Sequence, residues 1–153
     1  MSFEQNGSTG AAATPDGPPG ARVGIVLVSH SARLAEGLAE LAAEFGGDVP
    51  VAAAGGTEDG GLGTSIDKVD AAVRAVDRGA GVVLLADLGS AVLTVRTLLE
   101  EGGTEGAGLP RDVVLADAPL VEGTVAAVVS AAIGGDVASV VIAAEEARLF
   151  RKL

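Results

Sequence analysis

The most constraining feature of the chain is a junction near its beginning. Six nearly continuous apolar residues, Val23 to Val28, end in Ser29-His30-Ser31, and a helical pattern starts immediately afterwards. An apolar run of this length is typical of a strand that is buried on both faces in a parallel sheet. The junction therefore predicts a buried parallel strand whose carboxyl end delivers a histidine to the start of a helix.

The same alternation of strand and helix continues along the chain. Further strands are predicted at 49–54, 82–86 and 113–116. Helices are predicted from these apolar positions: Leu34, Leu38, Leu41 and Phe45; Ile66, Val69, Val73 and Val76; Val92, Val95 and Leu99; and the run 120–133. Residues 137–150 contain a strand-like run at 140–142, but their spacing favours a final helix.

Four strand-helix repeats predict an α/β fold, a doubly wound, open, four-stranded parallel sheet with helices on both faces. The common strand order 2-1-3-4 reverses between strands one and three, and ligands of such sheets bind beyond the carboxyl ends of the strands. We expect one domain at 22–153. Residues 1–21 are rich in Gly and Pro and contain almost no large apolar residue, so a disordered leader is predicted there.

His30 is the only histidine, and the chain has no cysteine, tyrosine or tryptophan. If covalent chemistry occurs near neutral pH, its imidazole is the obvious nucleophile. The alternative is an ordinary surface or core histidine. The predicted topology places it beside Asp87-Leu88-Gly89-Ser90, the polar residues that end the third strand.

This position suits transfer of a phosphoryl group. A phosphohistidine would lie against free backbone amides at the helix starts near Ser31, Thr64 and Gly89. Five of the nine residues from Gly55 to Gly63 are glycine, which indicates positive φ angles or close approach by another group.

Several residues could support His30, and each has a simpler interpretation. Asp87 could accept a hydrogen bond from the non-reacting ring nitrogen, or it could be a helix N-cap. Glu122 could be a further acceptor around the histidine, or a first-turn carboxylate favoured by the helix dipole. Arg33 could meet phosphate or a partner, or it could be a solvated residue on the helix surface.

Composition excludes several classes of function. The formal charge of -11 and an aromatic content of 2% argue against binding to nucleic acid or to anionic membranes. The absence of cysteine excludes disulfides and thiolate metal ligands, and we expect no metal site. The chain lacks a P-loop and a dinucleotide-binding glycine motif. No secretory signal is evident, which predicts a cytoplasmic protein.

Five ordered motifs between residues 22 and about 147 resemble the phosphotransfer subunits of phosphoenolpyruvate-dependent dihydroxyacetone kinases, which are related to mannose-type enzyme IIA domains. They are Val26–Ser31, Ala53–Gly56, Gly63–Ser65, Asp87–Ala91 and Ala118–Thr124. The resemblance includes Gly55, Gly56, Ser65 and Ser90 among the residues that support the site. Ser31 after the histidine, and the short Leu88-Gly89-Ser90, favour the kinase subunit over the sugar-transport domain.

The resemblance implies a phosphoenolpyruvate-glycerone phosphotransferase subunit. His30 would accept phosphate on Nε2 from the phosphohistidine carrier HPr, and would pass it to ADP on the nucleotide-binding subunit of the kinase, where ATP is regenerated. It also implies a homodimer and no cofactor bound by this chain. Two alternatives are a mannose-type sugar-transport enzyme IIA domain and a non-catalytic regulatory or binding module with the same fold.

Overall fold

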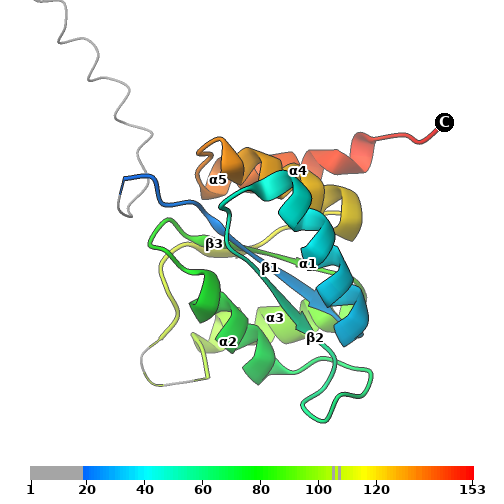
Figure 1. Ribbon diagram of the computed structural model, residues 1–153. Coiled ribbons are helices and arrows are strands. Elements are labelled where there is room, and N and C mark those ends of the chain that lie inside the picture. The colour runs from blue at the N-terminus through cyan, green and yellow to red at the C-terminus, as the bar shows by residue number, and fades with distance from the viewer. Residues whose placement is uncertain (1–18, 105, 107) are drawn as a thin grey trace, which may run out of the picture.

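The computed structural model describes residues 19–104, 106 and 108–153, so the predicted leader at 1–21 lies almost wholly outside the described residues. Its centre is a four-stranded parallel sheet in the order β2-β1-β3-β4, which confirms the predicted topology (Figure 1). The strands are β1 (Gly24–Ser29), β2 (Val51–Gly55), β3 (Val82–Ala86) and β4 (Val113–Leu115).

Five α-helices follow the strands, and they end close to where the sequence predicts. They are α1 (Ala32–Gly46), α2 (Ile66–Val76), α3 (Gly89–Glu101), α4 (Leu120–Ala132) and α5 (Val137–Glu146), with a short 3-10 turn at Ala147–Leu149. The prediction of a helix after residue 137 is confirmed. Asp136 caps it by accepting a hydrogen bond from the Ser139 amide at 2.9 Å.

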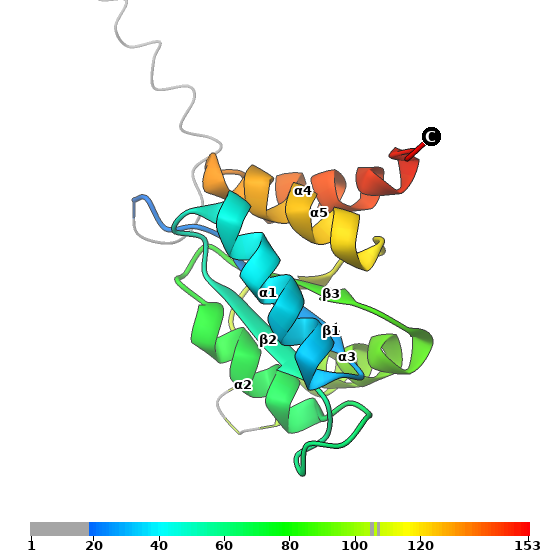
Figure 2. The same cartoon turned by 45° about the vertical axis from the view of Figure 1, so that its right-hand side comes forward.

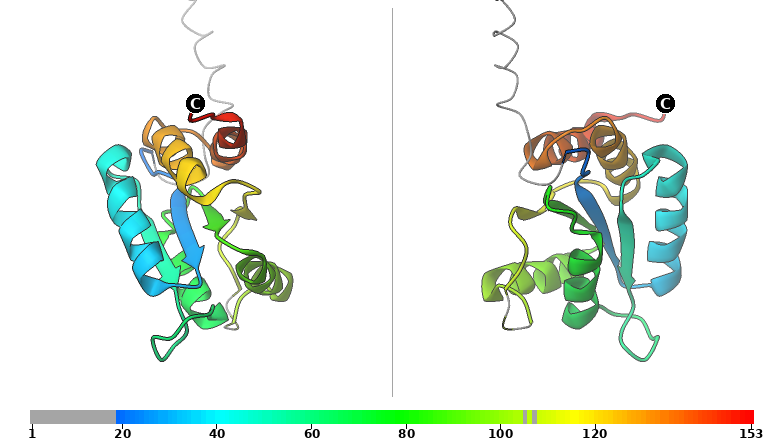
Figure 3. Two further views of the ribbon diagram at one scale, coloured as in Figure 1. Left: turned by 90° about the vertical axis from the view of Figure 1, so that its right-hand side faces the viewer. Right: turned by 60° about the vertical axis from the view of Figure 1, so that its left-hand side comes forward.

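Helices cover both faces of the sheet, with α1, α4 and α5 on one face and α2 and α3 on the other (Figures 2 and 3). Successive residues of β1 point to opposite faces, so Ile25 and Leu27 pack with the first group, and Val26 and Val28 pack with the second. All six residues of β1 are buried. This burial on both faces explains why the strand reads as a continuous apolar run.

The apolar stripe predicted on α1 is not the face that packs on the sheet. Leu38 is buried, but Leu34, Leu41 and Phe45 are 46%, 42% and 48% exposed. The buried face consists mainly of small residues, Ala35, Ala42 and Gly46, together with Leu38. Small side chains let the helix lie close to the sheet and to α4, and this contact turns most of the larger side chains towards solvent.

None of the described helices is long and apolar enough to span a membrane.

A close contact between β1 and α2 gives a test of the packing. A methyl group added at Gly24 would lie 2.4 Å from the Val76 carbonyl oxygen. We expect Gly24→Ala to lower the free energy of unfolding by about 1–3 kcal/mol, because the helix must move away from the strand. Urea denaturation measures this change.

Gly37→Ala is the matched control, because Gly37 is an exposed residue inside α1 and an added methyl group meets nothing within 4 Å. Alanine is the better helix former, so this variant is expected to gain roughly 0.5–1 kcal/mol. Equal stabilities for the two variants would contradict the packing described.

Candidate active site

The ends of β1 and β3 are joined by the carboxylate of Asp87. Its Oδ2 accepts hydrogen bonds from the Ser29 hydroxyl at 2.8 Å and from the His30 amide at 3.0 Å. Its Oδ1 lies 2.9 Å from Nδ1 of the His30 ring. The strand register pairs Val28 with Ala86, so the two polar ends meet directly. The predicted proximity of His30 and Asp87 is therefore confirmed.

The hydrogen bonds keep Asp87 ionised. Burial by itself raises the pKa of this carboxyl group, but the bonds from Ser29, from the His30 amide and ring, and from the Leu88 amide outweigh burial and leave the pKa below its usual value. An ionised carboxylate can only accept hydrogen bonds. Nδ1 of His30 must therefore carry the proton, and in a neutral ring Nε2 is unprotonated and accepts hydrogen bonds.

The Nε2 end of the ring faces the start of α3. Nε2 is hydrogen-bonded to the hydroxyl of Ser90, the second residue of that helix, and a quarter of the His30 side chain is exposed. The alternative prediction that Asp87 is the helix N-cap is wrong, because Leu88 occupies that position and makes no side-chain capping bond. Asp87 lies one residue before the N-cap of α3, and its carboxylate bonds to the ring of His30.

The glycine-rich segment after β2 holds the backbone around the histidine. The Gly63 amide donates to the His30 carbonyl at 2.9 Å, and the Gly56 amide donates to the Ser29 carbonyl at 3.1 Å. Gly56 has a φ of 75°, and a side chain on Gly55 would collide with the Ser31 carbonyl. Glycine is therefore required both for the turn and for the close approach of the two segments.

Ser29 and Ser31 both contribute to the junction between β1 and α1. Ser31 is the N-cap of α1 and accepts from the Leu34 amide at 3.2 Å. Ser29 is buried, and its hydroxyl accepts from the Ser31 amide at 3.0 Å while donating to Asp87. One hydroxyl thus connects the turn after β1 to the carboxylate after β3.

A contact that was not predicted from the sequence joins Thr64, just after the glycine-rich segment, to α3. The hydroxyl of Thr64 lies 2.7 Å from that of Thr94, which also donates to the carbonyl of Ser90 at 3.1 Å. Thr94 is four residues after Ser90 and so lies on the same helix face. The polar residue four positions after Ser90 is the sequence feature that could have predicted this contact.

Three predicted site residues are placed elsewhere by the structure. Arg33 is exposed on α1, and Ser65 caps α2 and donates to Glu58 at 3.2 Å. Glu122, in the first turn of α4, forms an ion pair with Lys152. Among the described contacts, none of the three reaches His30 or Asp87. Glu122 matches its interpretation as a first-turn carboxylate, and the role of Arg33 towards phosphate or a partner stays a prediction.

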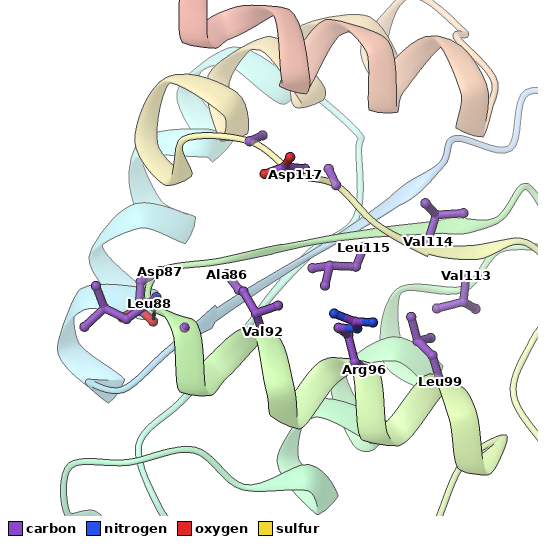
Figure 4. Close-up of a pocket in the computed structure, with 13 residues that line it drawn as sticks. Ala86, Asp87, Leu88, Val92, Arg96, Leu99, Val113, Val114, Leu115 and Asp117 are labelled. Atoms are coloured by element: carbon purple, nitrogen blue, oxygen red, sulfur yellow. Dashed lines mark hydrogen bonds between the residues drawn. The ribbon is translucent and has the colours of Figure 1, made fainter.

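A hollow of about 660 Å³ lies beside this cluster, between α3 and β4 (Figure 4). It extends from Asp87 and Leu88 along the α3 face that carries Val92 and Arg96, and reaches Asp117 after β4. His30 does not line it. This hollow lies one strand further along than the reversal between β1 and β3, where the hydrogen-bonded cluster of Ser29, His30 and Asp87 stands.

Within the described residues, no three His, Asp or Glu side chains are grouped closely enough to hold a metal ion. The groups that the structure brings together at the site are one imidazole, one ionised carboxylate, hydroxyl groups and the backbone at the start of α3.

Comparisons with known proteins agree on one family. Residues 24–141 match the family model described as PTS system fructose IIA component. The phosphoryl donor subunit DhaM of a PEP-dependent dihydroxyacetone kinase from Escherichia coli is 42% identical over 82% of this chain, but the chain spans only 27% of that protein. The corresponding subunit of kinase 2 from Listeria innocua is 40% identical, and the match covers 70% of this chain and 84% of that protein.

Solved structures agree with the fold. A crystal structure described as an unknown function protein has 30% identity and a TM-score of 0.68, covering 82% of this chain and 94% of its own. A sigma-54 interaction domain protein from Enterococcus faecalis, at 18% identity and a TM-score of 0.55, shares the fold alone. The chain thus belongs to the PTS IIA family of the fructose and mannose type, and within it to the DhaM phosphoryl donor subunits.

Proposed function

We propose that this chain is the phosphoryl relay subunit of a PEP-dependent dihydroxyacetone kinase. In this proposal His30 accepts a phosphoryl group from phosphorylated HPr and passes it to ADP bound on the nucleotide-binding subunit of the kinase. The observation that carries the proposal is the bond from Nδ1 of His30 to Asp87, which leaves Nε2 unprotonated at the end of the ring that faces the Ser90 hydroxyl. The names of the relatives support the kinase as the physiological context.

The first step forms one P–N bond and breaks another. The Nε2 lone pair attacks the phosphorus of the donor's phosphohistidine, and the electron pair of the broken bond returns to the donor's ring. No proton has to leave His30, because Nε2 carries none. The ring gains positive charge when the new bond forms, and the ionised Asp87 at 2.9 Å stabilises that charge.

The start of α3 can receive the transferred anion. The amides of Ala91 and Val92 bond to the Leu88 carbonyl, but Gly89 and Ser90 occupy the first two helical positions, whose amides have no acceptor within the helix. A side chain on Gly89 would meet nothing within 4 Å, so the space beside that residue is open. Backbone amides and the helix dipole both favour an anion there.

In the second step the phosphoryl group leaves His30 for ADP. A terminal phosphate oxygen of ADP attacks the phosphorus, the P–Nε2 bond breaks, and Nε2 recovers its lone pair. The nucleotide belongs to the partner subunit, so this chain needs no cofactor of its own, and a homodimer is part of the same proposal. A mannose-type transport domain would instead pass the group to a IIB domain, so incubation of the phosphorylated protein with each acceptor separates the two functions.

His30→Gln tests the identity of the nucleophile. We expect wild-type protein incubated with phosphoenolpyruvate, enzyme I and HPr to acquire an acid-labile phosphate, and the variant to acquire none, because the amide has no comparable nucleophilic lone pair. Radiolabel transfer measures the result, and circular dichroism checks folding. Equal labelling of the two proteins would exclude His30 as the acceptor.

Asp87→Asn tests the role of the carboxylate. An asparagine keeps the shape but removes the charge and can present a donor to Nδ1, which favours the wrong tautomer. We expect the rate of phosphorylation to fall by about 10²–10⁴, by analogy with other histidines that are oriented by a carboxylate. Rapid-quench kinetics with phosphorylated HPr measures this rate.

Asp117→Asn is the matched control, because Asp117 follows the neighbouring strand β4, is exposed, and pairs with Arg148 at 3.5 Å. Its rate should equal that of the wild type. A similar loss in both variants would mean that acidic charge in general, and no specific bond to His30, is what matters.

A further inference from the structure

Two threonine hydroxyls form a second connection across the candidate active site, in addition to Asp87. The Thr64 hydroxyl lies 2.7 Å from that of Thr94, and the Thr94 hydroxyl donates to the Ser90 carbonyl at 3.1 Å. A hydroxyl has one proton to donate, so the proton of the Thr64–Thr94 bond comes from Thr64. The bonds therefore run in one direction, from Thr64 through Thr94 to the backbone of Ser90.

Both ends of this connection are attached to His30. Thr64 follows Gly63, whose amide donates to the His30 carbonyl at 2.9 Å. At the other end, the hydroxyl of Ser90 bonds to Nε2 of the ring. Asp87 bonds to the opposite nitrogen, Nδ1. The carboxylate therefore orients the ring, and the threonine pair links the backbone of His30 to the helix turn that faces Nε2.

The start of α3 is held only in part by packing and capping. The helix packs on the sheet through a short row of buried residues, Ala91, Val95 and Leu98. The N-cap residue Leu88 makes no side-chain capping bond. Val92 and Arg96 line the hollow of about 660 Å³, so the helix has open space on the side of β4 (Figure 4).

Thr94 lies on the side of α3 that is opposite this open space. It is two positions from Val92 and two from Arg96, and two positions correspond to a rotation of about 200° around an α-helix. Ser90, one turn earlier, shares the side of Thr94. The bond from Thr64 therefore holds the first turn of α3 from the side away from the hollow, and opposes a shift of the helix towards it.

The proposed phosphoryl transfer depends on where α3 begins. In that proposal the transferred group lies between Nε2 and the amides of Gly89 and Ser90. Preorganised donors stabilise charge when they are aimed at the position where the charge develops. A displacement of about 1 Å can lower a rate by about a hundredfold. A bond that fixes the start of α3 can therefore control the rate without touching the phosphoryl group.

We propose that Thr94 is a positioning residue for phosphoryl transfer to His30, and that its bond with Thr64 keeps the first turn of α3 aligned with Nε2. This inference rests on the proposed function. Among the described contacts, neither threonine reaches the ring, so the effect passes through Ser90 and Gly63. Loss of the bond should slow transfer from every donor and should leave the bond from Nδ1 to Asp87 intact.

Thr94→Val tests this role, because valine keeps the branched shape and removes the hydroxyl. We expect kcat for phosphorylation by phosphorylated HPr to fall by about ten- to a hundredfold, with KM unchanged. The rate with phosphoramidate, a small donor that releases ammonia, should fall by the same factor, because both reactions need the same alignment at Nε2. Thr94→Ser keeps the hydroxyl and should restore both rates. Rapid-quench kinetics measures them.

Thr64→Val and the double variant test whether the two hydroxyls act as a pair. Because they share one bond, the double variant should react no more slowly than the slower single variant. Losses that multiply in the double variant would mean that the threonines act separately, and would overturn the pairing. Thr64 precedes α2, outside any helix, so this variant also tests the proposal if Thr94→Val does not fold.

Nitrogen NMR of the ring gives a readout that a change in stability alone does not move. His30 is the only histidine, so protein made with ¹⁵N-labelled histidine shows one Nδ1 and one Nε2 resonance. In Thr94→Val we expect the Nε2 resonance to move, because the Ser90 hydroxyl is displaced from it. The Nδ1 resonance should stay in place, because the bond to Asp87 remains.

Thr97→Val is the matched control. Thr97 is exposed on the same helix, and among the described residues its hydroxyl has no hydrogen-bond partner. This variant should match the wild type in both rates and in both ring resonances.

Equal rates for folded Thr94→Val and Thr97→Val would overturn the proposal, and so would an unmoved Nε2 resonance. A loss confined to phosphorylated HPr would assign Thr94 to recognition of the donor and would also overturn it. A wild-type protein that acquires no phosphate from either donor would contradict the proposed function, a result distinguishable from failure of the threonine pair.

Discussion

The hydrogen bonds around Asp87 connect the fold to the proposed chemistry. One carboxylate joins the ends of β1 and β3, fixes the ring of His30 and receives the only proton of the Ser29 hydroxyl. Because Asp87 is partly buried, its charge would be costly without those donors, and with them its pKa is lowered. The bonds that stabilise the junction of the two strands therefore also set the tautomer of the histidine.

The parallel sheet makes this arrangement possible. Parallel strands end at the same edge, so a histidine and a carboxylate that are far apart in the sequence lie beside each other when their strands are neighbours. The helices that follow start at the same edge, and α3 begins three residues after the end of β3, so Ser90 in its first turn lies next to Nε2. In the proposed reaction, strand ends supply the reactive groups, and a helix start supplies the donors for the transferred anion.

The sequence by itself determined the elements, the strand order and the position of His30 beside Asp87, because hydrophobic periodicity and the topology of parallel sheets depend on local patterns and general packing rules. Only the tertiary structure decided which side chains meet. It paired Glu122 with Lys152, introduced Thr94, and exposed Leu34, Leu41 and Phe45 on α1. The physical reason is that contacts between elements depend on how closely they approach, and on α1 it is the small residues Ala35, Ala42 and Gly46 that permit the close approach to the sheet.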